Sequence, residues 1–111
     1  MAIIYHLASK AGWEEARFEE EYRAESLARE GCIHCAKDRN QALANRLFTG
    51  RTDVVVLEVD TSRLSSPLKH EPSRSGEVYP HIYGPLNTGA VVGVLSLSTG
   101  DGGVFRLGGP I

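Results

Sequence analysis

Short apolar runs separated by polar turns make up most of the chain. Residues 54–59 are a nearly continuous β-branched run, which predicts a strand at the centre of a sheet. Residues 3–7, 32–36 and 90–95 are further β-favouring runs, and each predicts another strand, with residues 3–7 expected as an interior strand. Strand candidates are therefore spread along the whole chain.

The C-terminal part has the pattern of a hairpin. Asp101-Gly102 is a turn signal, and residues 104–107 are suited to return beside the strand over 90–95. We therefore expect residues 98–111 to form a C-terminal hairpin or tail.

Helical spacing first occurs directly after the N-terminal strand. Ser9 is a candidate N-cap for a helix that includes residues 13–18. The charged residues of this helix occupy its solvent side, and we expect Trp13 and Phe18 to belong to the core.

A second helix is predicted over residues 37–48. Asp38 is its candidate N-cap, and Gly50 ends the pattern. Residues 22–27, between the two helices, are interpreted as a connector or a short strand.

Two segments have the composition of loops. Residues 63–76 are rich in Ser and Pro and predict a polar loop. Residues 76–86 contain Pro80 and Pro85, which cannot donate ladder hydrogen bonds, so we expect loop or sheet rim rather than a central strand. A rigid loop that carries titratable groups is a common place for catalytic or ligand-binding residues.

The order of these elements is β-α-β-α-β-loop-β-β, which predicts an α+β fold. We expect one compact domain over residues 1–111 with two main helices. The connections are too irregular for a doubly wound sheet, and neither G-x-G-x-x-G nor a P-loop sequence occurs.

Composition narrows the class of partner. The 111 residues are 41% hydrophobic and 23% charged, as in an ordinary globular domain. The net charge is -2 and basic residues are scattered, so we expect no long nucleic-acid duplex as partner, whereas one or two arginines suit a small anionic ligand. No membrane-spanning run and no signal peptide are evident, so we expect no membrane contact and a cytoplasmic location.

The two cysteines, Cys32 and Cys35, have C-x-x-C spacing. This spacing fits small buried thiols, redox chemistry or part of a metal site. A structural zinc site needs four ligands, and no second ligand pair is evident. We expect both thiols to be reduced and unbridged, because residues i and i+3 of one strand point to opposite faces.

Histidines stand in two of the apolar strands. His6 and His34 are each flanked by isoleucine or tyrosine in a short β-favouring run. Each is either a core histidine with backbone hydrogen bonds or a ligand-binding group at a strand end.

A third histidine lies among carboxylates and phenols. His81 is either a loop anchor or a general acid or base, with Tyr83 close by in sequence. Glu71 and Glu77 are the candidate carboxylates of this region. We expect His81 to share one cleft with the two strand histidines.

Several motifs together resemble the DUF952 family of small bacterial proteins over nearly the whole chain, roughly residues 3–107. The segments that carry the resemblance are 4–7 (IYHL), 22–27 (YRAESL), 30–35 (EGCIHC), 50–53 (GRTD) and 79–86 (YPHIYGPL). Position 32 more often carries an aromatic residue in that family, which makes the C-x-x-C spacing incidental.

That family in turn resembles a compact ADP-ribosyltransferase-like fold, with split antiparallel or mixed sheets. The resemblance implies that His6 holds the ribose of NAD and that His34 packs near nicotinamide. It also implies a glutamate that offsets positive charge on the ribose, with Glu71 as first choice and Glu77 as second. The Gly-Thr or Gly-Ser that usually follows the first histidine is replaced here by Leu7-Ala8.

The residues expected to act are thus of two kinds. The candidate catalytic residues are Glu71, His81 and Glu77. The candidate contacts to NAD or another nucleotide are His6, His34, Tyr83, Arg51 and Ser26. No metal ligand is assigned.

Three functions remain open at this point. The first is an NAD-using transferase or hydrolase of the ADP-ribosyl type. The second is a non-catalytic module that binds a nucleotide or another small molecule. The third is a metal-binding protein that uses histidine and cysteine.

Overall fold

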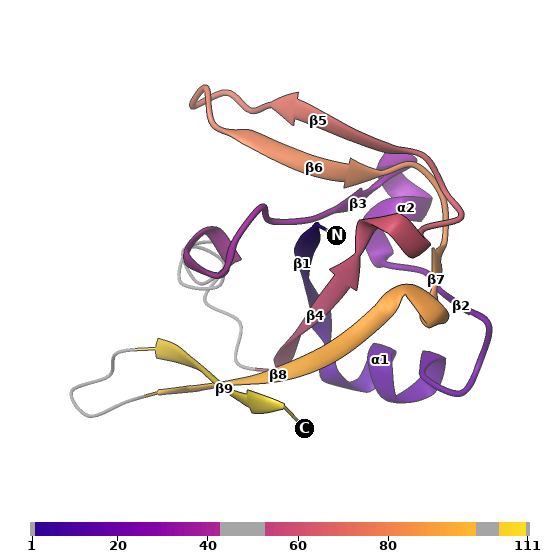
Figure 1. The fold of residues 1–111 in the computed structure, drawn as a ribbon, viewed down its shortest axis with the longest axis vertical. Helices are drawn as coiled ribbons and strands as arrows, with labels where there is room; N and C mark the ends of the chain where they lie inside the picture. Colours follow the sequence, from indigo (N-terminus) through magenta and orange to yellow (C-terminus); the bar gives the residue numbers. More distant parts are fainter. Residues whose placement is uncertain (1, 43–52, 100–104, 111) are drawn as a thin grey trace.

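A four-stranded antiparallel sheet forms the larger layer of the molecule. The structure is a computed structural model that describes residues 2–42, 53–99 and 105–110. The strand order is β1-β4-β8-β9, with β1 (Ile3–Ser9), β4 (Val54–Asp60), β8 (Val91–Thr99) and β9 (Phe105–Pro110) (Figure 1). These strands confirm the apolar runs at 3–7, 54–59 and 90–95 and the interior place of the β-branched run, and β9 pairs antiparallel with β8 as expected for the C-terminal residues. β1 stands at one end of this sheet rather than in its interior, which corrects the place predicted for residues 3–7. The predicted turn at Asp101-Gly102 lies outside the described residues.

The first helix, α1 (Lys10–Ala16), begins where predicted. The Gly12 amide donates to Ser9 Oγ at 3.0 Å, so Ser9 is the N-cap, and Trp13 is buried. Phe18, which we predicted in the core, is 83% exposed and lies under the Arg17 guanidinium at 4.9 Å. The helix ends before Phe18, so helical spacing no longer directs this side chain inward.

A second helix, α2 (Glu25–Glu30), occupies a segment that we interpreted as connector or short strand. It is preceded by β2 (Glu21–Tyr22), which pairs with β7 (Leu86–Asn87). Gly31 closes the helix in the left-handed conformation, with φ of 79°, and its amide donates to the Leu27 carbonyl. The helix lacks a side-chain N-cap, so its start carries no sequence signal.

The helix predicted over residues 37–48 is present as far as it is described. Residues 39–42 are helical, and the Gln41 amide donates to Asp38 Oδ1 at 2.7 Å, which makes Asp38 the N-cap. The remainder of this prediction, with Gly50 and Phe48, lies outside the described residues.

A three-stranded antiparallel sheet includes parts of both segments that we predicted as loops, so both predictions were wrong there. Its order is β3-β6-β5, with β3 (Ile33–His34), β5 (Leu68–Pro72) and β6 (Val78–Ile82). β5 lies inside the segment predicted as a polar loop, and β6 is a central strand rather than a rim. Short 3-10 helices, η1 (Thr61–Arg63) and η2 (Thr88–Ala90), follow β4 and β7.

Pro80 explains why β6 was misread. Its Cα stands opposite His70 of β5, and its carbonyl accepts from the Cys35 amide at 3.0 Å. In an antiparallel ladder the N–H and C=O of one residue point to the same side. The missing N–H of Pro80 therefore falls on the β3 side, beyond the end of that two-residue strand, where no ladder bond is required.

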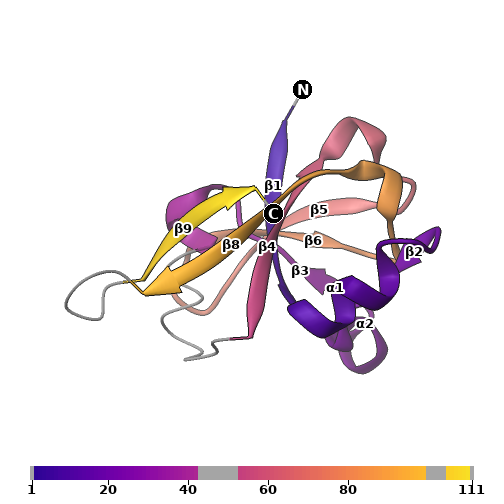
Figure 2. The same ribbon diagram turned by 90° about the horizontal axis from the view of Figure 1, so that it is seen from below.

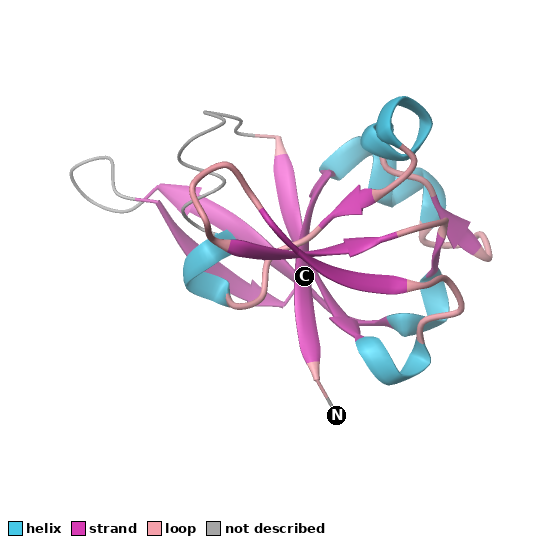
Figure 3. Cartoon of the chain, turned by 90° about the horizontal axis from the view of Figure 1, so that it is seen from above, coloured by secondary structure: helices cyan, strands magenta, loops and turns pink. Residues whose placement is uncertain are grey.

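The core lies between the two larger sheets. Strands β3, β5 and β6 run across the direction of β1 and β4 in Figures 2 and 3. Ile33 and Ile82 of the three-stranded sheet are fully buried, as are Leu57 and Val59 of β4. With every strand pair antiparallel and the helices beside the sheets, the molecule has the predicted α+β architecture. No helix among the described residues is long and apolar enough to cross a membrane.

Candidate functional site

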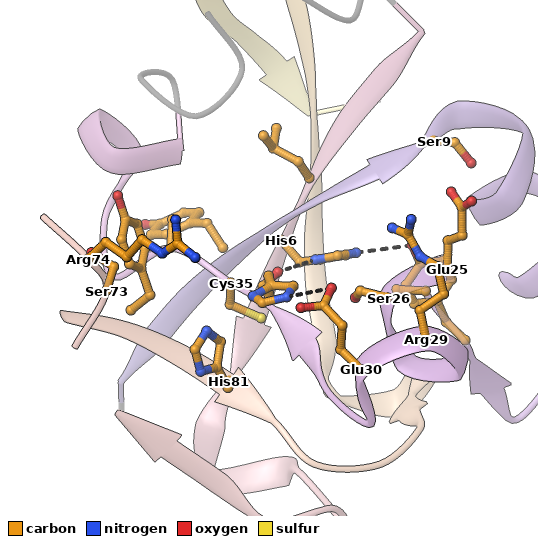
Figure 4. A pocket seen from close by; sticks show the side chains of 17 residues that line it. His6, Ser9, Glu25, Ser26, Arg29, Glu30, Cys35, Ser73, Arg74 and His81 are labelled. Atoms are coloured by element: carbon orange, nitrogen blue, oxygen red, sulfur yellow. Dashed lines mark hydrogen bonds and ion pairs between the residues drawn. The ribbon is translucent and has the colours of Figure 1, made fainter. Parts of the chain in front are cut away.

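A cavity of about 830 Å³ opens between β1, α2, β3 and the turn that joins β5 to β6. Its titratable lining includes all three histidines that the sequence singled out (Figure 4). The residues that define its chemistry are His6, Arg29, Glu30, His34, Arg74 and His81. The prediction that His6, His34 and His81 converge on one cleft is confirmed.

Strand pairing brings these histidines together. His34 of β3 stands opposite His81 of β6 in the ladder, so both side chains share one face of the three-stranded sheet. The opposite face carries Ile33 and Ile82 into the core. His6 joins them from β1, whose residue Tyr5 forms a bridge with Ala36 just after β3.

His6 is saturated with hydrogen bonds. Its Nδ1 lies 2.7 Å from the His34 carbonyl oxygen, and its Nε2 lies 3.0 Å from the Tyr22 hydroxyl. Because a carbonyl only accepts, Nδ1 carries the proton and Nε2 accepts from the phenol. Burial lowers the pKa of His6 to about 4, so the ring is neutral at physiological pH. Of the two roles left open for His6, this geometry matches the core histidine.

His34 and His81 form an edge-to-face pair, with ring centroids 4.8 Å apart at 88°. His34 Nε2 lies 3.2 Å from Glu30 Oε2, and His81 Nδ1 lies 2.6 Å from Glu71 Oε1. Each imidazole thus has its own carboxylate on one nitrogen. Among the described residues, nothing bonds the second nitrogen of either ring.

Glu71 acts on the cavity through His81. The Tyr83 hydroxyl and His81 Nδ1 both contact Oε1 of Glu71, and these hydrogen bonds, the Tyr83 bond first, lower the pKa of the carboxyl. The same bond raises the pKa of Tyr83 to about 12. Neither Glu71 nor Tyr83 lines the cavity, so neither side chain is placed to contact a ligand there directly.

The remaining predicted residues have separate places. Glu77 is exposed, accepts from the Tyr79 hydroxyl at 3.1 Å and does not line the cavity. Ser26 lines the cavity, and its Oγ donates to the Cys32 carbonyl at 2.9 Å. Arg51 lies outside the described residues.

Sequence reasoning missed four charged residues of the cavity. Glu25, Arg29 and Glu30 come from the unpredicted helix α2, and Arg74 comes from the β5–β6 turn. Within the described ranges neither arginine makes an ion pair. The one signal that could have found Glu30 is its distance of four residues from His34 across Gly31.

The cysteines are free and buried. Only Cys35 lines the cavity, and burial raises the pKa of both thiols, with neighbouring Glu30 adding to the rise at Cys32. Both thiols are therefore protonated and poorly nucleophilic. Among residues 2–42, 53–99 and 105–110, no three His, Cys, Asp or Glu side chains are grouped to hold a metal ion.

Comparisons with known proteins place the chain among relatives without assigning a reaction. Residues 7–94 match the model of a family described as "Protein of unknown function (DUF952)". The crystal structure of protein CC0527 from Caulobacter crescentus is 30% identical, with a TM-score of 0.79, over 95% of this chain and 94% of that one. Its solution NMR structure is 31% identical, with a TM-score of 0.74, over 94% and 91%. Among curated proteins, none matches the chain.

Proposed function

The chain belongs to the DUF952 family, and from that premise we propose that its cavity binds a phosphate-bearing small molecule of the nucleotide class. We further propose that His81, oriented by Glu71, is the acid–base group of the site. The observation that carries this proposal is the 2.6 Å contact between His81 Nδ1 and Glu71, in a cavity with two arginines that make no ion pair with any described residue.

Size and charge support the ligand class. Small-molecule sites usually enclose about 300–1,000 Å³, and this cavity encloses about 830 Å³. Arg29 and Arg74 enter it from different elements, and guanidinium groups match phosphate oxygens in geometry and charge. Tyr79 adds an aromatic ring to the lining, which suits contact with a base or a sugar.

The contact with Glu71 supports the role of His81. An ionised carboxylate on Nδ1 fixes the proton there and leaves the Nε2 lone pair to accept a proton. The lowered pKa of Glu71 keeps that carboxylate ionised at neutral pH. His81 then activates a hydroxyl or water as the nucleophile.

We propose NAD as the first candidate ligand, and transfer or hydrolysis of its ADP-ribosyl group as the reaction. Breaking the bond between nicotinamide and ribose develops positive charge on the sugar, and a nearby carboxylate lowers that barrier. Glu30, which lines the cavity, suits this role better than Glu71 or Glu77, which do not.

The test measures binding and turnover separately. Thermal unfolding is followed with NAD, ADP-ribose and mononucleotides, and nicotinamide release from NAD is then assayed with and without acceptor proteins. We expect stabilisation by NAD, and release that falls about 100-fold in His81→Gln with binding retained. The exposed His70 of β5 supplies the matched control, His70→Gln, which leaves release unchanged.

Two outcomes would contradict the proposal in different ways. Stabilisation by nucleotides without nicotinamide release would leave a non-catalytic binding module. Stabilisation by no nucleotide, or by divalent metal alone, would overturn the ligand class itself.

A further inference from the structure

His34 and His81 form a matched pair of imidazole rings, whereas a single general base would require only one of them. The two rings belong to neighbouring strands, touch edge to face, and each bonds a separate carboxylate with one nitrogen. Each ring keeps one nitrogen that no described residue bonds, and both rings line the same cavity. Such a pair can remove a proton at one point of a substrate and supply one at another.

We propose that His81 and His34 act as general base and general acid in the cleavage of a ribonucleotide phosphodiester. This further activity rests on the proposed nucleotide-binding cavity and is independent of NAD turnover. Its substrate class is a short ribonucleotide in which a hydroxyl of the ribose neighbours the phosphate.

The step balances without any other reactant. The 2′-oxygen of the ribose attacks the neighbouring phosphorus, and its proton passes to Nε2 of His81. The bond from phosphorus to the leaving 5′-oxygen breaks, and that oxygen receives the proton of His34 Nδ1. The products are a 2′,3′-cyclic phosphate and a free 5′-hydroxyl, and Arg29 and Arg74 are available to hold the phosphate charge.

Exposure assigns the two roles. His81 is the more enclosed ring, with 16% of its side chain exposed, and the ionised Glu71 orders its Nδ1 proton. The side chain of His34 is 49% exposed, and its Nε2 lies 3.2 Å from Glu30 Oε2. The acid therefore lies nearer to solvent, where a leaving group departs, and Glu30 and Glu71 act as positioning residues.

The proposed step requires one neutral ring and one protonated ring. The charged or titratable groups around the pair include Glu25, Arg29 and Glu30 of α2, Glu71 and Lys69 of β5, Arg74 of the turn and His6 of β1. Cleavage should accordingly show a bell-shaped dependence on pH.

Two substrates separate the acid from the base. One is a dinucleoside monophosphate, whose alkoxide leaving group needs a proton. The other is uridine with a 4-nitrophenyl ester on its 3′-phosphate, whose leaving group departs without one. We expect His81→Gln to lose at least about 100-fold on both substrates, and His34→Gln to lose as much on the dinucleotide only. The alkaline fall in rate should appear with the dinucleotide, and on the nitrophenyl ester both the wild type and His34→Gln should lack it.

The controls define what overturns the proposal. His70→Gln should cleave both substrates at the wild-type rate, and a deoxyribose substrate should bind but remain intact. Full activity in His81→Gln would reveal a contaminating nuclease, and equal losses of His34→Gln on both substrates would remove its acid role.

Binding measurements distinguish a failure of the phosphodiester proposal from a failure of the proposed function. Stabilisation by the deoxyribose dinucleotide with no cleavage of the ribonucleotide would overturn the phosphodiester activity alone. No stabilisation by any nucleotide would overturn both proposals.

Discussion

Histidines at the inner and outer ends of the cavity differ in how many of their ring nitrogens are hydrogen-bonded to the protein. At the inner end, His6 is 5% exposed and both of its ring nitrogens have protein partners. At the outer end, His34 and His81 each have one nitrogen on a carboxylate and one nitrogen that the described residues leave unbonded. Imidazole rings that line one cavity therefore differ in what they can offer a ligand.

The difference follows from burial. An imidazole taken out of water must replace both of its hydrogen bonds within the protein, and once it does so no donor or acceptor is left for chemistry. A ring that remains partly exposed needs only one fixed partner, which orients it and leaves the other nitrogen reactive. We therefore assign His6 to the architecture of the site and the outer pair to its reaction.

The largest expected effect is on stability at the inner end. His6→Ala removes two buried hydrogen bonds and leaves a void, so we expect the free energy of unfolding to fall by about 4 kcal/mol. His81→Ala, in the partly exposed outer pair, should cost less than about 1.5 kcal/mol. Urea unfolding of both variants measures the contrast, and equal losses would contradict the division between the two ends.

The second effect depends on pH. The pKa of His6 falls from 6.5 in the unfolded chain to about 4 in the folded protein. The stability that His6 contributes is therefore fully present above pH 6.5. As the pH falls from 6.5 towards 4, the unfolded chain takes up a proton that the folded ring refuses, which costs about 3 kcal/mol. The pKa of Glu71 is also lowered, so the stability that its carboxylate contributes is lost only at more acidic pH.

His6→Gln isolates this contribution, since glutamine does not titrate. The difference in unfolding free energy between wild type and variant should shrink steadily over the same pH range, as measured by urea unfolding at each pH. A difference that stays constant with pH would show that His6 is not held neutral.

The smallest effect concerns the outer end and leaves the fold nearly unchanged. Glu71→Gln removes the charge that raises the pKa of Tyr83 to about 12, so that phenol should titrate closer to 10.0. Ultraviolet absorbance during alkaline titration reports the change, and Tyr83→Phe identifies the signal. An unchanged titration would mean that Glu71 does not hold Tyr83 and His81 together in solution.

Strand prediction succeeded where one physical signal dominated. Residues 54–59 and 90–95 are apolar and β-branched, and they form β4 and much of β8. The strands β5 and β6 each carry one polar face and one proline, so their composition matched loops. Pro80 is tolerated in β6 only because its partner β3 ends there, and that depends on a distant segment of the chain.

The site was predictable in part for the same reason. Histidines in apolar strands indicated the cleft, and the proximity of Glu71 and Glu77 to His81 in sequence marked both as candidate carboxylates. Arg29 and Glu30 could not be placed because α2 has no N-cap signal. Glu71 and Glu77 are both surface carboxylates by sequence, and only the register of β5 against β6 brings Glu71 to His81.

Pro80 has one more consequence, which concerns the place where the three-stranded sheet meets the larger one. The Cys35 amide donates to the Pro80 carbonyl at 3.0 Å, but Pro80 has no N–H to return a bond to Cys35, so the pairing of β3 with β6 ends there. The next residue, Ala36, instead exchanges two backbone hydrogen bonds with Tyr5 of β1. A proline in the smaller sheet thus marks the point at which the chain leaves that sheet and joins the larger one, and this crossing places His6 of β1 beside His34.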